Sequence, residues 1–286
     1  MKTKKIIVFG ANGMLGRYVT QYFKLKNYDV APITRTNLDL AGNRVEESVF
    51  RLIMNYNADQ LIVINCAGII KQRKGADMFS MLRVNSEFPH ILDYLSKMHP
   101  RIKNIQISTD CVFRGMDGEY LEDSIPDPVD DYGRTKLMGE NPNSCIIRTS
   151  IIGEEIFNKL SFLEWAKASK GKKVIGFENH YWNGVTCLQL AKYLEDKIRK
   201  NHLHKGVRHY FTTDSEFDYD FISKGHLLQL ISDEYDLKLK IELEKDSETV
   251  DRILITNYKT NPTPLFKQQI KELKEFGSIL KYGWND

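Results

Sequence analysis

Residues 6–16 decide the fold, and they read Ile6-Ile7-Val8-Phe9-Gly10-Ala11-Asn12-Gly13-Met14-Leu15-Gly16. The first four residues are apolar, which is typical of a strand that is buried on both faces. Three glycines follow in the spacing GxxGxxG, and apolar residues then recur at helical spacing as far as Phe23. Glycines permit a tight turn, and the helix N-terminus behind them offers unpaired N–H groups and a positive dipole end to a pyrophosphate. Close packing of the turn is the alternative explanation of the glycines.

Outward from this unit, the chain continues to alternate strand-like and helix-like segments. Further strands are expected at 28–33, 61–65, 104–108 and 145–149, and a helix carries apolar residues from Met78 to Leu95. The second half is less regular, with a helix at 187–199, strands at 207–213 and 237–243, and helical patterns around Leu228 and after Pro264. Apolar strands that alternate with helices predict a parallel sheet covered on both faces.

The predicted fold class is therefore α/β, a Rossmann-type doubly wound parallel sheet with a smaller C-terminal α+β substrate lobe. Residues 1–153 are expected to form the cofactor-binding domain and to carry the catalytic residues. Residues 154–286 are expected to form mainly the substrate lobe, with some of the chain crossing back to the first domain.

Composition narrows the range of partners. The 286 residues include 41 basic and 38 acidic side chains, a net charge of +3, which argues against a strongly electrostatic nucleic-acid binder. No apolar run approaches the ~20 residues that span a bilayer, and no signal-peptide pattern follows the N-terminus. The four cysteines are far apart and form no CxxC pair, so neither a metal site nor a disulfide framework is expected. We expect a cytoplasmic protein that binds no membrane.

The segment after the second strand points to the cofactor. An acidic residue there would bind the ribose 2′-hydroxyl of NAD, but this chain has Thr34-Arg35-Thr36. A guanidinium pairs well with a 2′-phosphate, which predicts NADPH, with NADH as the weaker cofactor, although a solvated arginine is the alternative. Asp39 is expected on the adenine side of the cofactor. Cys66, Ala67 and Gly68 follow a central strand, where small residues let the backbone approach the cofactor or simply pack.

The segment 132–136, Tyr-Gly-Arg-Thr-Lys, carries the predicted acid–base chemistry. On a helix, Tyr132 and Lys136 stand at i and i+4 on one face. An ammonium near a phenol favours the phenolate and brings its pKa toward the working pH, which suits proton transfer to a carbonyl oxygen. Thr109 follows another central strand, where its hydroxyl can bind the same oxygen. A helix-surface contact and an ordinary strand-end hydroxyl are the alternatives.

In combination these motifs resemble the extended short-chain dehydrogenase/reductases. The closer resemblance is to the dTDP-4-dehydrorhamnose reductase group, and it rests on segments 108–113, 117–120, 126–128, 132–136, 139–140 and 148–150. It is dense over residues 5–153 and thinner beyond. The resemblance implies reduction of a UDP- or dTDP-linked 4-keto-6-deoxy sugar by NAD(P)H, with Thr109, Tyr132 and Lys136 as catalytic residues and Lys136 also on the nicotinamide ribose. The predicted cofactor contacts are Gly10, Asn12, Gly13, Met14, Leu15, Gly16, Arg35, Asp39, Cys66, Ala67, Gly68, Tyr132 and Lys136.

The substrate is expected to meet Thr109, Asp110 and Cys111 and residues of the C-terminal lobe. Trp182, with the adjacent Asn183, is a candidate to stack on a base, and Arg252 to pair with a diphosphate. Core packing of Trp182 and a surface role for Arg252 are equally good explanations.

Cys111 raises a second activity. The resemblance extends to GDP-fucose synthases and plant-type UDP-rhamnose synthases, which carry a cysteine at the same offset that exchanges protons at the sugar carbons flanking the ketone. His180 is the candidate for the second proton-transfer group, with Lys159 behind it, but neither falls at the family position. A small buried thiol that only packs is the alternative.

Three functions remain open on this basis. The first is an NADPH-dependent 4-keto-reductase, and the second is a bifunctional 3,5-epimerase and 4-reductase. The third is a catalytically silent regulatory subunit, which the intact set of Thr109, Tyr132 and Lys136 disfavours. Whether the protein is a homodimer is left open as well.

Overall fold

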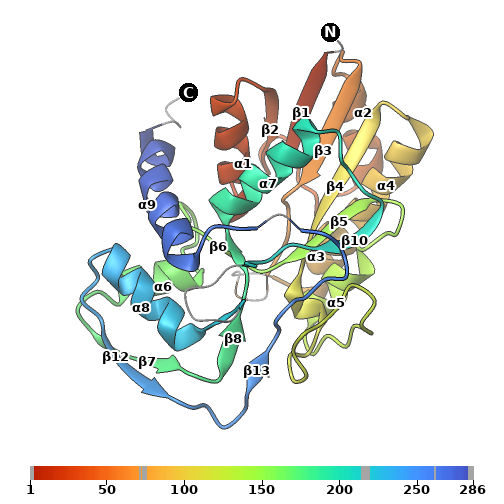
Figure 1. Cartoon of the computed structure of the whole chain (residues 1–286). Helices are drawn as coiled ribbons and strands as arrows, with labels where there is room; N and C mark the ends of the chain where they lie inside the picture. The colour runs from red at the N-terminus through yellow and green to blue at the C-terminus, as the bar shows by residue number, and fades with distance from the viewer. Residues whose placement is uncertain (1–2, 71, 73–75, 214–219, 261, 283–286) are drawn as a thin grey trace.

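The computed structural model describes residues 3–70, 72, 76–213, 220–260 and 262–282 (Figure 1). A six-stranded sheet has the order β10-β5-β4-β3-β1-β2, and every neighbouring pair is parallel. The strands are β1 (Lys4–Phe9), β2 (Asp29–Ile33), β3 (Gln60–Asn65), β4 (Ile102–Thr109), β5 (Cys145–Thr149) and β10 (Gly206–His209). The predicted Rossmann-type sheet is confirmed.

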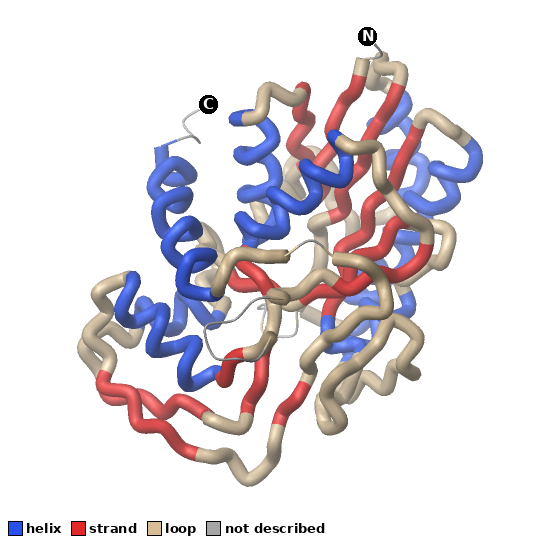
Figure 2. The backbone as a smooth tube through the Cα atoms, in the orientation of Figure 1, coloured by secondary structure: helices blue, strands red, loops and turns tan. Residues whose placement is uncertain are grey.

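The sheet is buried on both faces, as the apolar run of β1 predicts. Ile6 and Val8 face a core shared with helices α1 (Met14–Leu25), α7 (Cys187–Arg199) and α9 (Phe266–Tyr282). Ile7 and Phe9 face the opposite core, which includes α2 (Val45–Met54) and α4 (Phe88–Met98). All four side chains are fully buried, and Figure 2 shows the helices on the two sides of the strands.

A smaller lobe lies beyond the carboxyl ends of the strands, in the lower part of Figure 1. Its strands form a ribbon of β7 (Lys173–Phe177) with β12 (Lys240–Glu244), and a sheet of β8 (His180–Trp182) with β11 (Ile222–Ser223) and β13 (Val250–Asp251). Helices α6 (Phe162–Ala168) and α8 (Lys224–Glu234) complete it. A two-stranded link, β6 (Ile151–Ile152) with β9 (Val185–Thr186), leads back to α7 and β10, so the second half of the chain also builds the large sheet.

Several elements differ from those expected from the sequence. Helix α2 was not predicted. The strand expected at 207–213 ends at His209 because Thr212 leaves the sheet and its N–H donates to Asn183 O at 2.7 Å. The strand expected at 237–243 begins only at Lys240, because Asp236 and Lys238 have positive φ in a turn. The helix expected from Met78 is α3 (Met78–Met81), a π-helical segment η1 (Leu82–Glu87) and then α4.

A buried ion pair joins two neighbouring central strands. Arg148 on β5 donates to both carboxylate oxygens of Glu140, with Nη2–Oε2 at 2.7 Å, and the two side chains are only 4% and 6% exposed. Ser108 on β4 donates its hydroxyl to the same carboxylate at 2.5 Å. Glu140 follows α5 (Asp131–Met138), so this cluster holds α5 against the strand ends.

Breaking this pair from one side is therefore expected to destabilise the protein. Arg148→Met leaves the Glu140 carboxylate buried without its partner, which costs about 3–5 kcal/mol in free energy of unfolding. Urea denaturation measures the loss. The double variant Arg148→Met/Glu140→Met is the matched control and should recover most of it, because no charge is left unpaired. Equal losses in the single and double variants would contradict this.

Candidate active site

The glycine-rich loop is held by contacts that leave no room for a side chain. Gly10 has a φ of +72°, and a Cβ there would lie 2.7 Å from the backbone nitrogen of Ala67. A Cβ on Gly16 would lie 2.1 Å from the carbonyl oxygen of Gly10. Close packing thus accounts for these two glycines. The tight turn lets α1 start at the carboxyl edge of the sheet. The helix has neither a side-chain cap nor an acidic residue in its first turn, so its N-terminus suits an anion.

The other predicted cofactor contacts surround this loop to different degrees. Cys66, Ala67 and Gly68 follow β3 directly behind Gly10, and the N–H of Cys66 donates to Phe9 O at 3.1 Å. Asn12 keeps a buried Oδ1 that has no hydrogen-bond partner among the described residues. Met14 is half-buried at the start of α1, Leu15 is part of the core, and Gly13 is the N-cap residue of the helix.

Arg35 and Asp39 lie together after β2. Arg35 Nη2 and Asp39 Oδ2 are 3.1 Å apart, and both side chains are exposed. The loop adjoins the glycine-rich turn because Ala11 N–H donates to Ile33 O at 3.1 Å. Arg35 and Asp39 are thus one ion pair beside the loop, and their roles toward a cofactor stay predictions.

The structure brings Thr109 and Tyr132 together. Thr109 ends β4, and its hydroxyl lies close enough to the phenol of Tyr132 to lower the pKa of that phenol, although the hydroxyl itself donates to Asp110 Oδ1 at 3.0 Å. Tyr132 lies in the first turn of α5, which Asp130 caps by accepting from Gly133 N–H at 2.8 Å. A Cβ on Gly133 would lie 2.2 Å from Cys111 O. The glycine next to Tyr132 therefore lets α5 press directly against the end of β4.

The electrostatics of the pair differ from the expectation. Burial is the main cause that raises the pKa of Tyr132, while the nearby Thr109 hydroxyl opposes it. Lys136 donates its Nζ to Ile107 O at 2.6 Å, and burial lowers its own pKa to about 8. Lys136 thus bonds to the strand rather than activating the phenol. A phenol that stays protonated is the form that can give its proton to a carbonyl oxygen.

Asn85 is a site residue that the sequence did not single out. It is fully buried in η1, and its Nδ2 donates to Ile69 O at 2.9 Å and to Thr135 Oγ1 at 3.1 Å. Its Oδ1 accepts from Ile69 N–H at 2.8 Å. One amide thus joins the loop after β3 to the helix that carries Tyr132 and Lys136. The available signal was an asparagine within an apolar helical stripe, since a buried amide needs partners.

Cys111 is held beside the strand end as a thiol. It lies in the 3₁₀ turn η2 (Asp110–Val112), and its Sγ donates to Asp110 Oδ1 at 3.6 Å. Burial, with the nearby Asp110 carboxylate, raises the pKa of Cys111 to about 12. His180 pairs instead with Asp246, with Nε2 and Oδ2 at 3.1 Å, and Lys159 is exposed on a loop. The structure therefore shows neither an activated thiolate nor a histidine paired with it.

The lobe residues expected to bind substrate are mostly occupied by internal contacts. Trp182 is 5% exposed, packs on Phe266 and donates Nε1–H to Ser150 Oγ at 2.9 Å, so packing describes it better than stacking on a base. The Asn183 amide bonds both the N–H and the C=O of Leu254. Arg252 donates to Phe113 O at 2.9 Å and to Arg114 O at 3.0 Å, which places its guanidinium beside η2.

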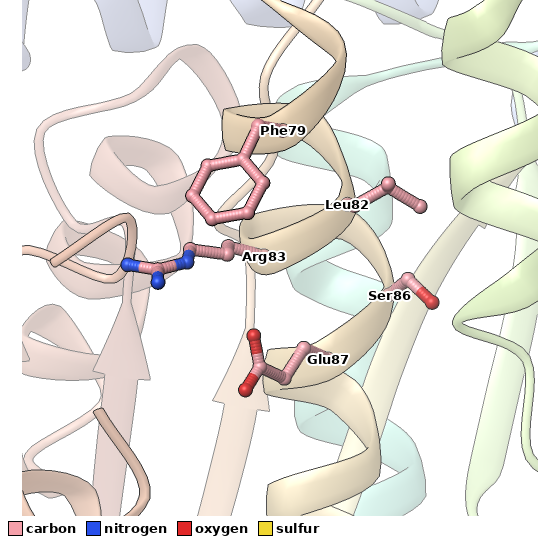
Figure 3. Close-up of a pocket in the computed structure, with 5 residues that line it drawn as sticks. All are labelled: Phe79, Leu82, Arg83, Ser86 and Glu87. Carbon is pink, nitrogen blue, oxygen red and sulfur yellow. The ribbon is translucent and has the colours of Figure 1, made fainter. Parts of the chain in front are cut away.

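Two hollows on the described surface bear on the site. One, of about 320 Å³, is lined only by Phe79, Leu82, Arg83, Ser86 and Glu87 and contains no predicted site residue (Figure 3). The other is a groove of about 760 Å³ in the small lobe. Its lining combines aromatic rings, lysines and the β7 backbone: Phe162, Trp165, Lys173, Val174, Ile175, Gly176, Phe177, Lys224, Leu228 and Glu242. The sequence patterns did not identify this groove, because its residues come from four separate elements.

The described residues contain neither a membrane-spanning helix nor a cluster of metal ligands. None of the helices in that part of the chain is long and apolar enough to cross a membrane. In the same residues, no group of three or more His, Cys, Asp or Glu side chains is placed to hold a metal ion.

Comparison with known proteins extends the sequence resemblance. A family model described as the RmlD substrate binding domain matches residues 4–221. The dTDP-4-dehydrorhamnose reductase of Mycolicibacterium smegmatis is 32% identical over 158 residues, which cover 51% of this chain and 45% of that protein. Methionine adenosyltransferase 2 subunit beta of Xenopus laevis is 26% identical over 247 residues, or 76% of this chain and 70% of that protein. This chain spans about half the length of most of the curated relatives it matches.

Solved structures share the fold at low sequence identity. The dTDP-4-dehydrorhamnose reductase of Bacillus anthracis, solved with NADP, has a TM-score of 0.77 at 18% identity, over 95% of this chain and 99% of that chain. A GDP-L-fucose synthetase of Naegleria fowleri bound to NADP has a TM-score of 0.74 at 16% identity, over 100% and 96% of the two chains. With the family match over most of the sequence, this chain belongs to the RmlD substrate-binding-domain family, among the dTDP-4-dehydrorhamnose-reductase-like extended short-chain dehydrogenase/reductases.

Proposed function

We propose that this protein uses NADPH to reduce the 4-keto group of a UDP- or dTDP-linked 4-keto-6-deoxyhexose, giving an L-rhamnose-type nucleotide sugar. The observation that carries the proposal is the closeness of the Thr109 and Tyr132 side chains at the carboxyl edge of the sheet, where open α/β folds bind their ligands. The free thiols of all four cysteines fit a reducing, cytoplasmic compartment.

The residues divide the chemistry among them. A bound NADPH supplies the hydride that adds to the ketone carbon. The Thr109 hydroxyl exchanges its hydrogen bond to Asp110 Oδ1 for one to the ketone oxygen, and Tyr132 gives its phenolic proton to that oxygen as the C=O bond becomes an alcohol. Because the pKa of Tyr132 is raised, the phenol keeps this proton until hydride transfer makes the ketone oxygen basic enough to take it. Lys136, one turn along α5, would bind the nicotinamide ribose and help to return the proton to Tyr132, for which its Nζ has to leave Ile107 O.

The cofactor assignment is argued from the loop geometry. The uncapped N-terminus of α1 and the orphaned Oδ1 of Asn12 lie where a dinucleotide pyrophosphate and its neighbouring polar groups would bind. Arg35 is the cation nearest in sequence to the end of β2, which favours NADPH over NADH. Its present partner, Asp39, is exposed, so exchange of that partner for a phosphate costs little.

The alternatives receive less support from the contacts. Epimerisation by Cys111 needs a thiolate and a second proton-transfer group, whereas the thiol is protonated and His180 pairs with Asp246. A silent regulatory subunit is the alternative that the methionine adenosyltransferase 2 subunit beta relatives bring to mind. The assembled Thr109, Tyr132 and Lys136 set has no need to be intact in such a subunit.

Product analysis tests the proposed reaction. We expect NADPH oxidation with UDP- or dTDP-4-keto-6-deoxyglucose that has been epimerised beforehand, and a rhamnose-type product by chromatography and NMR. Turnover of the unepimerised nucleotide, with solvent deuterium entering at C3 and C5, would instead establish the bifunctional enzyme. Tyr132→Phe is the control and should lower kcat by about 10²–10⁴-fold because the proton donor is lost. A near-normal kcat in this variant would contradict the assigned chemistry, and binding of NADPH without any turnover would favour the regulatory subunit.

The cofactor preference can be tested separately at Arg35. Arg35→Ala should raise the KM for NADPH while leaving the KM for NADH nearly unchanged, because only NADPH carries the 2′-phosphate. Steady-state kinetics with both cofactors measure the split. Arg44→Ala, at another arginine before α2, is the matched control and should change neither value. Equal losses with both cofactors would show that Arg35 does not recognise the phosphate.

A further inference from the structure

Lys224 is a cation in the wall of the small-lobe groove, and it has no hydrogen-bond or ion-pair partner among the described residues. It is the first residue of α8, and its Nζ lies 5.2 Å from the ring centroid of Phe162 and 5.1 Å from that of Trp182. Within the described part of the chain, its ammonium has neither a hydrogen bond nor an ion pair. Lys173, the other lysine of the groove, is exposed and paired with Glu242 at 2.5 Å. Among the described residues, the Lys224 ammonium thus lies over two aromatic rings and is attracted by Asp110 only at longer range.

The same ammonium faces the end of β4. Asp110 and Cys111 in η2 are the charged and titratable groups that most favour the protonated form of Lys224, whereas Arg252 disfavours it. The Asp110 Oδ1 is already used by the Thr109 hydroxyl and the Cys111 thiol. Lys224 and Arg252 thus both lie near the strand end that carries Thr109, where Asp110 favours the charged form of Lys224 and Arg252 opposes it.

The linear structure of a nucleotide sugar matches this arrangement. Its parts follow in the order base, ribose, diphosphate and sugar, so the diphosphate must lie between the site of the base and the site of the ketone. The groove, with its aromatic lining and its volume of about 760 Å³, suits a nucleoside, and Thr109 with Tyr132 marks the place of the ketone. Lys224 touches the groove on one side and faces η2 on the other.

We propose that Lys224, together with Arg252, binds the diphosphate of the nucleotide sugar and so determines specificity for a substrate with two negative charges at this point. This assignment rests on the proposed function and adds to it a binding residue that the sequence motifs do not contain. In the absence of substrate, Lys224 packs on Phe162 and Trp182 and faces Asp110.

The assignment has a consequence for proton binding. Burial lowers the pKa of Lys224 to about 8, so at pH 8 about half of the free protein carries it as a neutral amine. A diphosphate favours the ammonium and raises this pKa, so binding at pH 8 should take up about half a proton, and the uptake should vanish well below pH 8. The charged or titratable groups on the elements around Lys224 are Asp110, Cys111, Lys173, His226, Glu242 and Arg252.

Isothermal titration calorimetry tests the assignment directly. The probes are dTDP-glucose and UDP-glucose, added to the NADP⁺-loaded full chain at pH 8 in buffers of different ionisation enthalpy. Both phosphates of these probes are diesters, so the probes themselves do not titrate near this pH. We expect wild-type protein to take up about half a proton on binding. Lys224→Met should bind about 10–100-fold more weakly and without proton uptake, because a charge-assisted hydrogen bond is lost.

Two further variants make the result specific. Lys224→Arg should keep most of the affinity but take up no proton, because a guanidinium stays charged at pH 8. Lys271→Met, at an exposed lysine of α9 outside the groove, should keep both the affinity and the uptake. Wild-type binding without proton uptake, at an affinity that Lys224→Met does not change, would show that Lys224 only compensates Asp110. That result would overturn this assignment and leave the reductase intact. Absence of turnover in the product assay, with no binding of either probe, would overturn both.

Discussion

Backbone atoms at the carboxyl edge of the sheet approach one another so closely that no side chain fits between them, and the candidate site depends on this constraint. Gly10 presses on Ala67, Gly133 on Cys111, and Gly139 on Asn85, each at a distance that excludes a Cβ. Through these contacts the glycine-rich loop, the end of β4 and helix α5 meet at one place. Polar groups then fix what sterics have brought together: the Asn85 amide joins the loop after β3 to α5, and the Glu140 carboxylate joins α5 to β4 and β5.

The layout of the large sheet could be predicted from the sequence because its signals are local. Strand β1 is buried on both faces and is apolar from Ile6 to Phe9, and the turn after it packs so closely that Gly10 and Gly16 leave no room for a side chain, so residues 6–16 predict their own structure. The segment 132–136 likewise predicts a helix with Tyr132 and Lys136 on one face. Local sequence patterns do not predict which side chains contact each other across the fold. The sequence around Lys136 does not indicate that it donates to Ile107 O, and the sequence around His180 does not indicate that it pairs with Asp246.

The small lobe was harder to predict for a related physical reason. Its strands are two to five residues long and are largely half-exposed, so they lack both the length and the apolar continuity that mark a buried strand. Its groove is assembled from α6, β7, α8 and β12, which are far apart in the chain, and its most informative residue, Lys224, looks like any surface lysine in the sequence. Arg252 and Trp182 are candidate ligand-binding residues by residue type, but both are held by contacts within the protein.

The route of the chain between the two parts also bears on how such a protein can change over time. After β5 the chain enters the lobe, returns to add α7 and β10 to the large sheet, and then enters the lobe again before α9 packs beside α1. No single cut in the chain separates the small lobe from the large sheet, so a new lobe cannot be acquired by joining two genes end to end. The specificity of the lobe changes more readily by substitution of side chains and lengthening of loops within it. The segments that connect the lobe to the sheet meanwhile keep the groove at a fixed position relative to the strand ends.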